Sequence, residues 1–251
     1  VMEGVLIHPS GSTRFSEDVM VEDYADFRAD VLVVLKDPWV LQEVFNKAVN
    51  LVPYCDLDHS PVNPWMLARL HSAFRVLVPS RFAQRELRGE GIEGVTYMPH
   101  GVRTDLLRPL GDEDRAKCRR MWMIPEDHFV GLVIARNQVR KMIPWMLRCC
   151  RHFKQRNPDA KFRLFLFTDV EGQVIMDEGA VSMGVGDSGV WLLPEIIELG
   201  LHQDVMWPDK KLIRRGLVDW VGDNFVNGYD LCKLYNSADF VLNVTGGEGA
   251  S

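Results

Sequence analysis

Three cations fall within six residues of the chain, and side chains of this kind could bind phosphate. Arg136, Arg140 and Lys141 follow an apolar run from Phe129 to Ala135. Arginine can donate two parallel hydrogen bonds to phosphate oxygens, and lysine adds a compact positive charge, so the cluster suits a diphosphate. A solvated basic turn is the alternative, because charge runs usually decorate a surface. The position after an apolar run favours the diphosphate site.

A second loop suited to anions lies near the end of the chain. Residues 245–249 read Thr-Gly-Gly-Glu-Gly and follow the apolar run 240–244. Glycines allow a backbone to approach a ligand closely, and the first N–H groups of a following helix would face an anion. A plain turn between a strand and a helix is the alternative. Each loop alone is compatible with many proteins.

Both loops belong to a chain in which apolar runs alternate with helical patterns. The apolar runs are residues 31–35, 75–78, 95–98, 129–135, 162–167, 205–207 and 240–244. The helical patterns are residues 64–73, 81–90, 141–155, 190–199 and 229–237. Continuous apolar runs are typical of strands buried on both faces of a parallel sheet, and the alternation indicates βαβ units. We therefore predict an α/β fold with two doubly wound parallel sheets.

The stretch from Arg108 to Asp114 interrupts this alternation with proline, glycine and charge. Such a stretch is typical of a boundary between domains. We predict one Rossmann-like domain over residues 1–108 and a second over residues 109–251.

Composition excludes several classes of protein. The chain has 251 residues, 47% of them apolar and 25% charged, with a formal net charge of -6. An acidic chain is unsuited to coating nucleic acid. The sequence contains no apolar run of about 18 residues that would span a membrane, and no signal-peptide pattern. We expect a globular, cytoplasmic protein without a nucleic-acid partner or a membrane span.

Other polar side chains follow predicted strands, where open α/β sheets bind ligands. They are Thr168 and Asp169 after the run 162–167, Asp37 and Trp39 after the run 31–35, and His8 after residues 5–7. We expect His8 to face a cleft between the domains.

Three segments, in order, resemble motifs of the retaining GT-B glycosyltransferases of glycosyltransferase family 4. Residues 98–109 resemble the interdomain motif of that family, and residues 134–141 resemble its donor-phosphate loop. Residues 229–242, followed by Glu248 and Gly249, resemble the motif that ends in Glu-Gly-Phe-Gly. Residues 37–39, 52–58 and 78–83 resemble segments of the N-terminal domain, so the resemblance covers nearly the whole chain.

The resemblance implies a GT-B fold, in which an acceptor-side domain and a donor-nucleotide domain face a cleft. It implies a hexosyltransferase-type enzyme that moves a sugar from a nucleotide-diphosphate sugar to an acceptor, with retention at the anomeric carbon. No metal and no cofactor other than the donor substrate are needed. The acceptor, whether carbohydrate, lipid or protein, is not implied.

Site residues follow from the same resemblance. Arg136 and Lys141 match the pair that holds the donor diphosphate and stabilises the departing charge, and Glu248 lies beside the donor sugar. The implied donor-binding residues are Arg140, Gly247, Gly249, Thr168, Asp169, Tyr229 and Leu231. The acceptor-side or cleft residues are His8, Asp37, Trp39 and Asp58.

The sequence also departs from the family pattern. Ala135 and Met142 stand where the family usually has glycine, and no second glutamate or glycine-rich N-terminal loop is present. We therefore expect a chain that lacks both ends of such an enzyme, so that both domains are incomplete and its own activity is in question.

Several alternatives remain. A non-catalytic relative that binds a nucleotide sugar or a carbohydrate, or a GT-B sugar epimerase, would share the fold. Residues 184–189 satisfy Gly-x-Gly-x-x-Gly, but no strand pattern precedes them, as a dinucleotide site requires. Asp56 and Asp58 beside His59 have the spacing of a metal-binding Asp-x-Asp motif, yet they offer few ligands, so no metal site is predicted.

Overall fold

The computed structural model describes residues 6–13, 15–172, 189–208 and 228–246. The chain divides into two compact units, with the division between Gly101 and Val102. Each unit contains one four-stranded sheet, and all the strand pairs are parallel. The predicted α/β class with two parallel sheets is confirmed. Within the described residues, no helix has the length and apolar character needed to cross a membrane.

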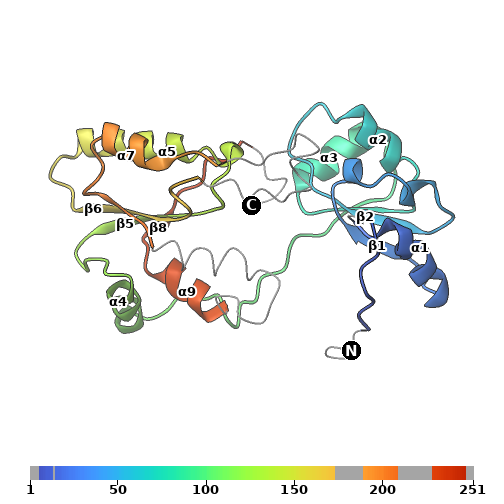
Figure 1. Ribbon diagram of the computed structural model, residues 1–251, viewed down its shortest axis with the longest axis horizontal. Coiled ribbons are helices and arrows are strands. Elements are labelled where there is room, and N and C mark those ends of the chain that lie inside the picture. The colour runs from blue at the N-terminus through green and yellow to red at the C-terminus, as the bar shows by residue number, and fades with distance from the viewer. Residues whose placement is uncertain (1–5, 14, 173–188, 209–227, 247–251) are drawn as a thin grey trace. The chain divides into compact units, whose positions relative to one another are not determined.

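The sheet of the first unit follows the order of the chain. It contains β1 (Leu32–Leu35), β2 (Leu51–Tyr54), β3 (Val76–Val78) and β4 (Val95–Tyr97), in the order β1-β2-β3-β4. The helices are α1 (Glu17–Asp26), α2 (Pro64–Leu70) and α3 (Arg81–Gly89), with short 3-10 turns η1 (Pro38–Val40) and η2 (Val44–Asn46). Figure 1 shows α2 and α3 on one face of this sheet.

Local sequence explains where α2 and α3 begin. The Asn63 side chain accepts a hydrogen bond from the Trp65 N–H, and the Ser80 hydroxyl accepts one from the Ala83 N–H. Such N-caps satisfy backbone donors that the first turn of a helix leaves unpaired. In α3, Ala83 and Leu87 lie one turn apart and are both fully buried against the sheet.

The apolar runs did not indicate β2, α1 or α4 (Asp112–Met121). All four residues of β2 are buried, but Pro53 stands at its centre, opposite Val34 of β1. Proline has no N–H for a strand ladder and normally argues against an inner strand. Helix α1 buries none of its residues, and α4 buries only Cys118 and Arg119, so neither has a clear apolar stripe.

The sheet of the second unit reverses direction within its strand order. It contains β5 (Phe129–Ile134), β6 (Phe162–Phe167), β7 (Val205–Met206) and β8 (Phe240–Val241), in the order β7-β6-β5-β8. The chain moves outward from β5 through β6 to β7 and then returns to place β8 on the other side of β5. The change of direction therefore lies between β5 and β8.

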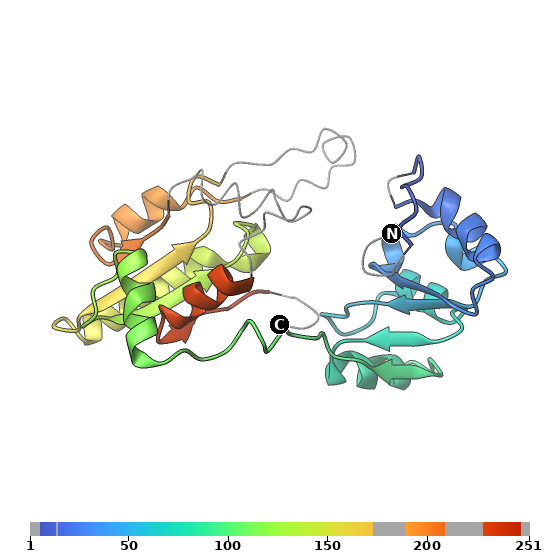
Figure 2. The ribbon, with the colours of Figure 1, turned by 90° about the horizontal axis from the view of Figure 1, so that it is seen from below.

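Helices cover both faces of this second sheet. Helices α5 (Ile143–Arg156) and α7 (Leu192–Glu198) lie on one face, and α4 and α9 (Gly228–Asn236) lie on the other (Figures 1 and 2). Along β6, Phe162, Leu164 and Leu166 pack in the core under α5 and α7. Phe165 points the other way and packs with Leu234 of α9. Because both faces are buried, β6 reads as a continuous apolar run, which made it predictable.

The segment that joins the two units is hydrogen-bonded to the second one. The Asn236 side chain donates to the Arg108 carbonyl at 2.9 Å and accepts from the Leu110 N–H at 2.8 Å. The backbone at Arg108 and Leu110 is therefore bonded to α9, and the division between the compact units, between Gly101 and Val102, lies before the boundary predicted at residue 108. The position of the predicted boundary followed composition, whereas the packing follows these hydrogen bonds.

Candidate functional site

The basic loop, residues 136–141, contacts the first two residues of the glycine-rich loop, residues 245–249. The Gly246 N–H donates a hydrogen bond to the Arg140 carbonyl at 2.8 Å, and the Thr245 hydroxyl donates to the same carbonyl at 3.1 Å. Residues that are more than a hundred positions apart in sequence thus form one surface. Of the glycine-rich loop, Gly247, Glu248 and Gly249 lie outside the described residues.

This surface lies where the strand order reverses. The basic loop follows β5, the residues up to Gly246 follow β8, and these two strands are neighbours in the sheet. In open α/β sheets, the connections after such a pair of strands diverge to opposite faces and leave a crevice that binds ligands. The topology therefore places the three cations at the position where this class of sheet binds its ligands.

The local backbone brings the cations to the start of a long helix. Val139–Lys141 form the 3-10 turn η3, and α5 begins directly after Met142 with Pro144 in its first turn. Arg136 and Arg140 are exposed, and Lys141 is half-buried. The first turn of α5 contains no acidic side chain, so the partial positive charge of the helix N-terminus adds to that of the cations. The arrangement is suited to a polyanion.

Met142 has an unusual backbone conformation, with φ of 53° and ψ of 35°. This is the left-handed region, which glycine adopts without a steric penalty and other residues do not. The family motif has glycine at this position. Met142 therefore adopts a conformation that glycine would adopt without the steric cost.

Asn137, which the sequence reasoning did not select, lies between Arg136 and η3. Its amide nitrogen donates to the carbonyls of Asp169 and Val190, each at 2.6 Å, and its side-chain oxygen accepts from the Val190 N–H at 3.0 Å. A polar amide next to a predicted phosphate-binding arginine, and followed by a second amide at Gln138, was the only sequence signal.

The remaining donor-side candidates lie at different depths. Thr168 directly follows β6 and is fully buried, and among the described residues its hydroxyl has no hydrogen-bond partner. Asp169 is half-buried and accepts from the Glu171 N–H at 3.0 Å. Leu231 packs against the core beneath α9, and Tyr229 belongs to the first turn of the same helix. The structure thus places Asp169 beside Asn137, and it places Leu231 on the α4 and α9 face.

An ion-pair network anchors the start of β8, which supports the site. The Asp239 carboxylate accepts hydrogen bonds from Arg119 at 2.7 Å, from Arg115 at 2.6 Å and from the Val130 N–H at 2.7 Å. Burial raises the pKa of Asp239, but these hydrogen bonds and the two guanidinium charges outweigh burial, so its pKa is lowered. The side chain of Arg119 is itself only 6% exposed.

The first unit carries acidic side chains at the carboxyl ends of its strands. Asp37 and Asp58, both predicted, and Asp56 between β2 and α2 interact through their charges. Burial is the main cause that raises the pKa of Asp56, and the charges of Asp37 and Asp58 raise it further, against the lowering effect of His100. Trp39 is 56% exposed, and Asp58 contacts His59 at 2.8 Å.

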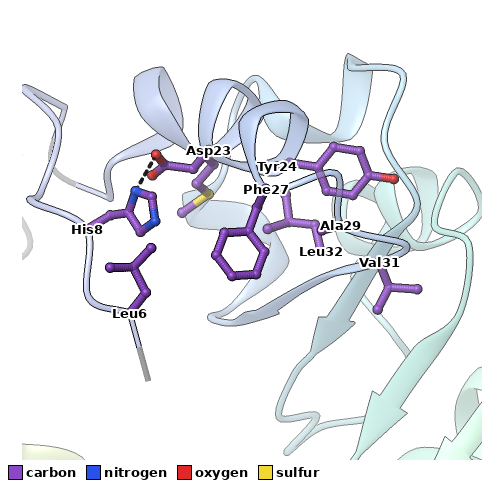
Figure 3. Close-up of a pocket in the computed structure, with 9 residues that line it drawn as sticks. Leu6, His8, Asp23, Tyr24, Phe27, Ala29, Val31 and Leu32 are labelled. Carbon is purple, nitrogen blue, oxygen red and sulfur yellow. Dashed lines mark ion pairs between the residues drawn. The ribbon is translucent and has the colours of Figure 1, made fainter. Parts of the chain in front are cut away.

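His8 lies away from these carboxylates, near the amino end of β1. Its Nδ1 contacts the Asp23 carboxylate of α1 at 2.8 Å, and its ring meets Phe27 edge-on. Figure 3 shows His8 and Asp23 at an open pocket of about 300 Å³ that is otherwise lined by apolar and aromatic side chains. The structure therefore does not bring His8 together with Asp37, Trp39 and Asp58. Among the described residues, no group of three or more histidine, cysteine or carboxylate side chains could hold a metal ion.

No protein-family model and no curated protein sequence matches the chain. Solved structures match it in fold. A glycosyltransferase from Rickettsia africae aligns at 12% identity with a TM-score of 0.59, over 96% of this chain and 59% of that one. Sucrose-phosphate synthase from Thermosynechococcus elongatus aligns at 14% identity with a TM-score of 0.58, over 89% and 52% of the two chains.

A third match is Anabaena HepE in complex with UDP-glucose, at 16% identity and a TM-score of 0.52, over 78% of this chain and 47% of that one. The chain thus spans about half to three fifths of the length of these proteins. Identities this low show the fold alone. The two parallel-sheet α/β domains are those of a GT-B fold.

Proposed function

We propose that this chain binds a nucleotide-diphosphate sugar at the loops after β5 and β8 and contributes to the transfer of the sugar to an acceptor. The observation that carries the proposal is the contact of Gly246 and Thr245 with Arg140, where the strand order reverses. This contact brings the backbone of Thr245 and Gly246 to the loop that carries the three cations and leads into the N-terminus of α5. UDP-glucose bound to HepE, a protein of the same fold, supports a donor of this class.

The chemistry assigned to these residues is electrostatic. During transfer, the bond between the anomeric carbon and a diphosphate oxygen breaks while the oxygen of an acceptor hydroxyl bonds to that carbon, and the hydroxyl proton passes to the departing diphosphate. Negative charge grows on the departing diphosphate, and we assign its stabilisation to Arg136 and Lys141, with Arg140 beside them. Glu248 is assigned to the donor sugar. Retention at the anomeric carbon and a hexose as the transferred sugar are part of the proposal and rest on the motif resemblance.

Titration calorimetry tests the anion site by measuring how tightly the 251-residue chain binds inorganic pyrophosphate. Arg136→Ala and Lys141→Ala should each weaken binding at least about tenfold, because hydrogen bonds to charged groups contribute roughly 1.5–3 kcal/mol. Arg156→Ala is the matched control, since Arg156 is an exposed cation in the last turn of α5, at the opposite end of the same helix. Equal affinities in the unchanged chain and both loop variants would refute the site.

Turnover is tested in the protein that carries this chain, with a panel of nucleotide sugars. The same two substitutions should each lower transfer by about 2–4 kcal/mol of transition-state stabilisation. A donor that binds but is never transferred or hydrolysed would instead support the non-catalytic binding protein. Interconversion of the donor sugar without transfer would support an epimerase.

A further inference from the structure

The Asn137 side chain makes three hydrogen bonds to the backbone of other segments and uses both of its N–H donors in them. Its two bonds to carbonyls at 2.6 Å are short for an amide donor, and its oxygen accepts from the Val190 N–H. None of these partners is in the basic loop. Three hydrogen bonds to two distant residues distinguish Asn137 from an asparagine in a solvated turn, whose amide would bond to water.

The partners of Asn137 come from two segments that meet beside the basic loop. Asp169 follows β6, and Val190 precedes α7. The Leu192 N–H donates to the Val170 carbonyl at 2.8 Å, and this bond joins the same two segments directly. We call Asn137, Asp169, Gly172, Gly189 and Val190 the Asn137 junction.

Two glycines show how closely the backbones of the Asn137 junction approach each other. A Cβ atom on Gly172 would lie 2.5 Å from the backbone of Val190. A Cβ atom on Gly189 would lie 2.8 Å from the Gly172 Cα and 2.9 Å from the Asn137 carbonyl oxygen. Real side chains do not make contacts this short, so the backbone segments are packed directly against one another and have little freedom to shift.

The basic loop is therefore held on both sides. Asn137 fixes its start against the connections after β6 and before α7, and Gly246 with Thr245 fixes Arg140 near its end. Arg136, the exposed cation next to Asn137, extends from a backbone whose direction is already set. A side chain whose backbone is ordered before binding loses less conformational entropy when it contacts a ligand.

We propose that Asn137 is a positioning residue that orients Arg136 toward a diphosphate. This inference rests on the proposed function, because it needs an anion at the basic loop. Asn137 contacts no ligand in this mechanism and acts through Arg136.

A double-mutant cycle with inorganic pyrophosphate as the probe tests the inference in the 251-residue chain. Asn137→Ala should weaken pyrophosphate binding by about tenfold, within the range of coupling between neighbouring residues. The same substitution should have little effect when Arg136→Ala is already present, because the residue through which it acts is gone. A purely structural role would give the same loss in both backgrounds, and that result would overturn the inference.

Asn157→Ala is the matched control. The Asn157 amide also donates to a backbone carbonyl, that of Phe153 at 2.9 Å, but it lies just after the far end of α5. It should leave pyrophosphate affinity unchanged, whatever its effect on melting temperature. If Asn137→Ala does not fold, Asn137→Ser, which keeps a hydroxyl donor, takes its place in the same cycle with a smaller loss in the same direction.

The two proposals fail differently. If Arg136→Ala and Lys141→Ala weaken pyrophosphate binding but Asn137→Ala and Asn137→Ser do not, the positioning role is wrong and the anion site stands. If neither cation affects binding, the anion site is wrong and the positioning role falls with it.

Discussion

The two sheets of this protein have the same parallel architecture but gather different charged side chains at their carboxyl edges. The edge of the first unit carries Asp37, Asp56 and Asp58, whereas the edge of the second carries Arg136, Arg140 and Lys141. The described strands of the first sheet follow chain order, and those of the second reverse between β5 and β8. Within the described ranges, the second edge is the one that combines a crevice-forming topology with a cluster of cations, so the fold alone does not decide which edge binds an anion.

The contrast assigns different ligand chemistry to the two edges. A diphosphate would be repelled by three neighbouring carboxylates, whereas hydroxyl groups or cations would not. Predictions that compare matched residues of the two units can break or sharpen this contrast.

The largest expected effect is the loss of unfolding free energy when a paired aspartate is replaced by asparagine. Asp239→Asn should lower the free energy of unfolding of the second unit by about 3 kcal/mol, because Arg119 would remain buried without its charged partner. The Val130 N–H donates a hydrogen bond to Asp239, so faster hydrogen exchange at this amide reports the loss locally. Because the pKa of Asp239 is lowered on folding, its contribution is present above its ordinary pKa and is lost as the pH falls through the lowered value.

Asp58→Asn is the comparison in the first unit, since Asp58 is exposed and, within the part of the chain that the structure describes, its ion pair is with the adjacent His59 at 2.8 Å. Its effect on unfolding should stay within about 0.5 kcal/mol, as for most surface substitutions. A loss as large as that of Asp239→Asn would show that the acidic edge is structural and would remove the contrast.

A smaller effect is expected at the glycines around the basic loop. Gly172→Ala should destabilise the chain by about 1–3 kcal/mol, because Gly172 has φ of 64° and no room for a Cβ beside Val190. Gly246→Ala should change stability by less than about 1 kcal/mol, since its Cβ would meet Arg140 and Met142 at an ordinary 3.6 Å. Thermal unfolding of the two variants compares them directly, and equal losses would contradict the packing described for the Asn137 junction.

The smallest effect concerns the pH dependence of the acidic edge. Because the pKa of Asp56 is raised on folding, the folded chain holds its proton more tightly, and stability falls as the pH rises from the ordinary value of 3.8 through the raised value. Asp56→Asn should therefore raise the free energy of unfolding slightly at pH 7, by no more than about a few tenths of a kcal/mol after solvent screening. The difference in stability between the unchanged chain and Asp56→Asn should vanish below about pH 3.8, where the protonated aspartate is as neutral as the asparagine. A stabilisation that persists there would point to a cause other than charge.

The sequence allowed the second sheet to be predicted better than the first. Strands such as β6 are buried on both faces and therefore appear as unbroken apolar runs. The strand β2 was missed because Pro53 contradicts the usual rule for inner strands, and α4 was missed because charged residues fill most of it. Local patterns report burial, and both of these elements are positioned by tertiary contacts instead.

The cations of the candidate site were predictable, but the way they are supported was not. Arg136 and Lys141 stand out by charge and position after a strand. The bonds from Asn137 to Asp169 and Val190 join residues separated by 32 and 53 positions, and nothing in the spacing of an isolated asparagine announces such partners. The roles of Glu248, Gly247 and Gly249 stay predictions from the motif resemblance.

The hydrogen bonds of Asn236 have a practical consequence for protein engineering. Because this side chain binds the backbone at Arg108 and Leu110, the polypeptide just upstream of α4 behaves as part of the second unit. A chimaera that exchanges this unit with that of another GT-B protein should therefore be spliced at or before Val102. A splice at residue 109 would put a foreign backbone at position 108, so the carbonyl that Asn236 bonds would keep its place only if that backbone follows the same path.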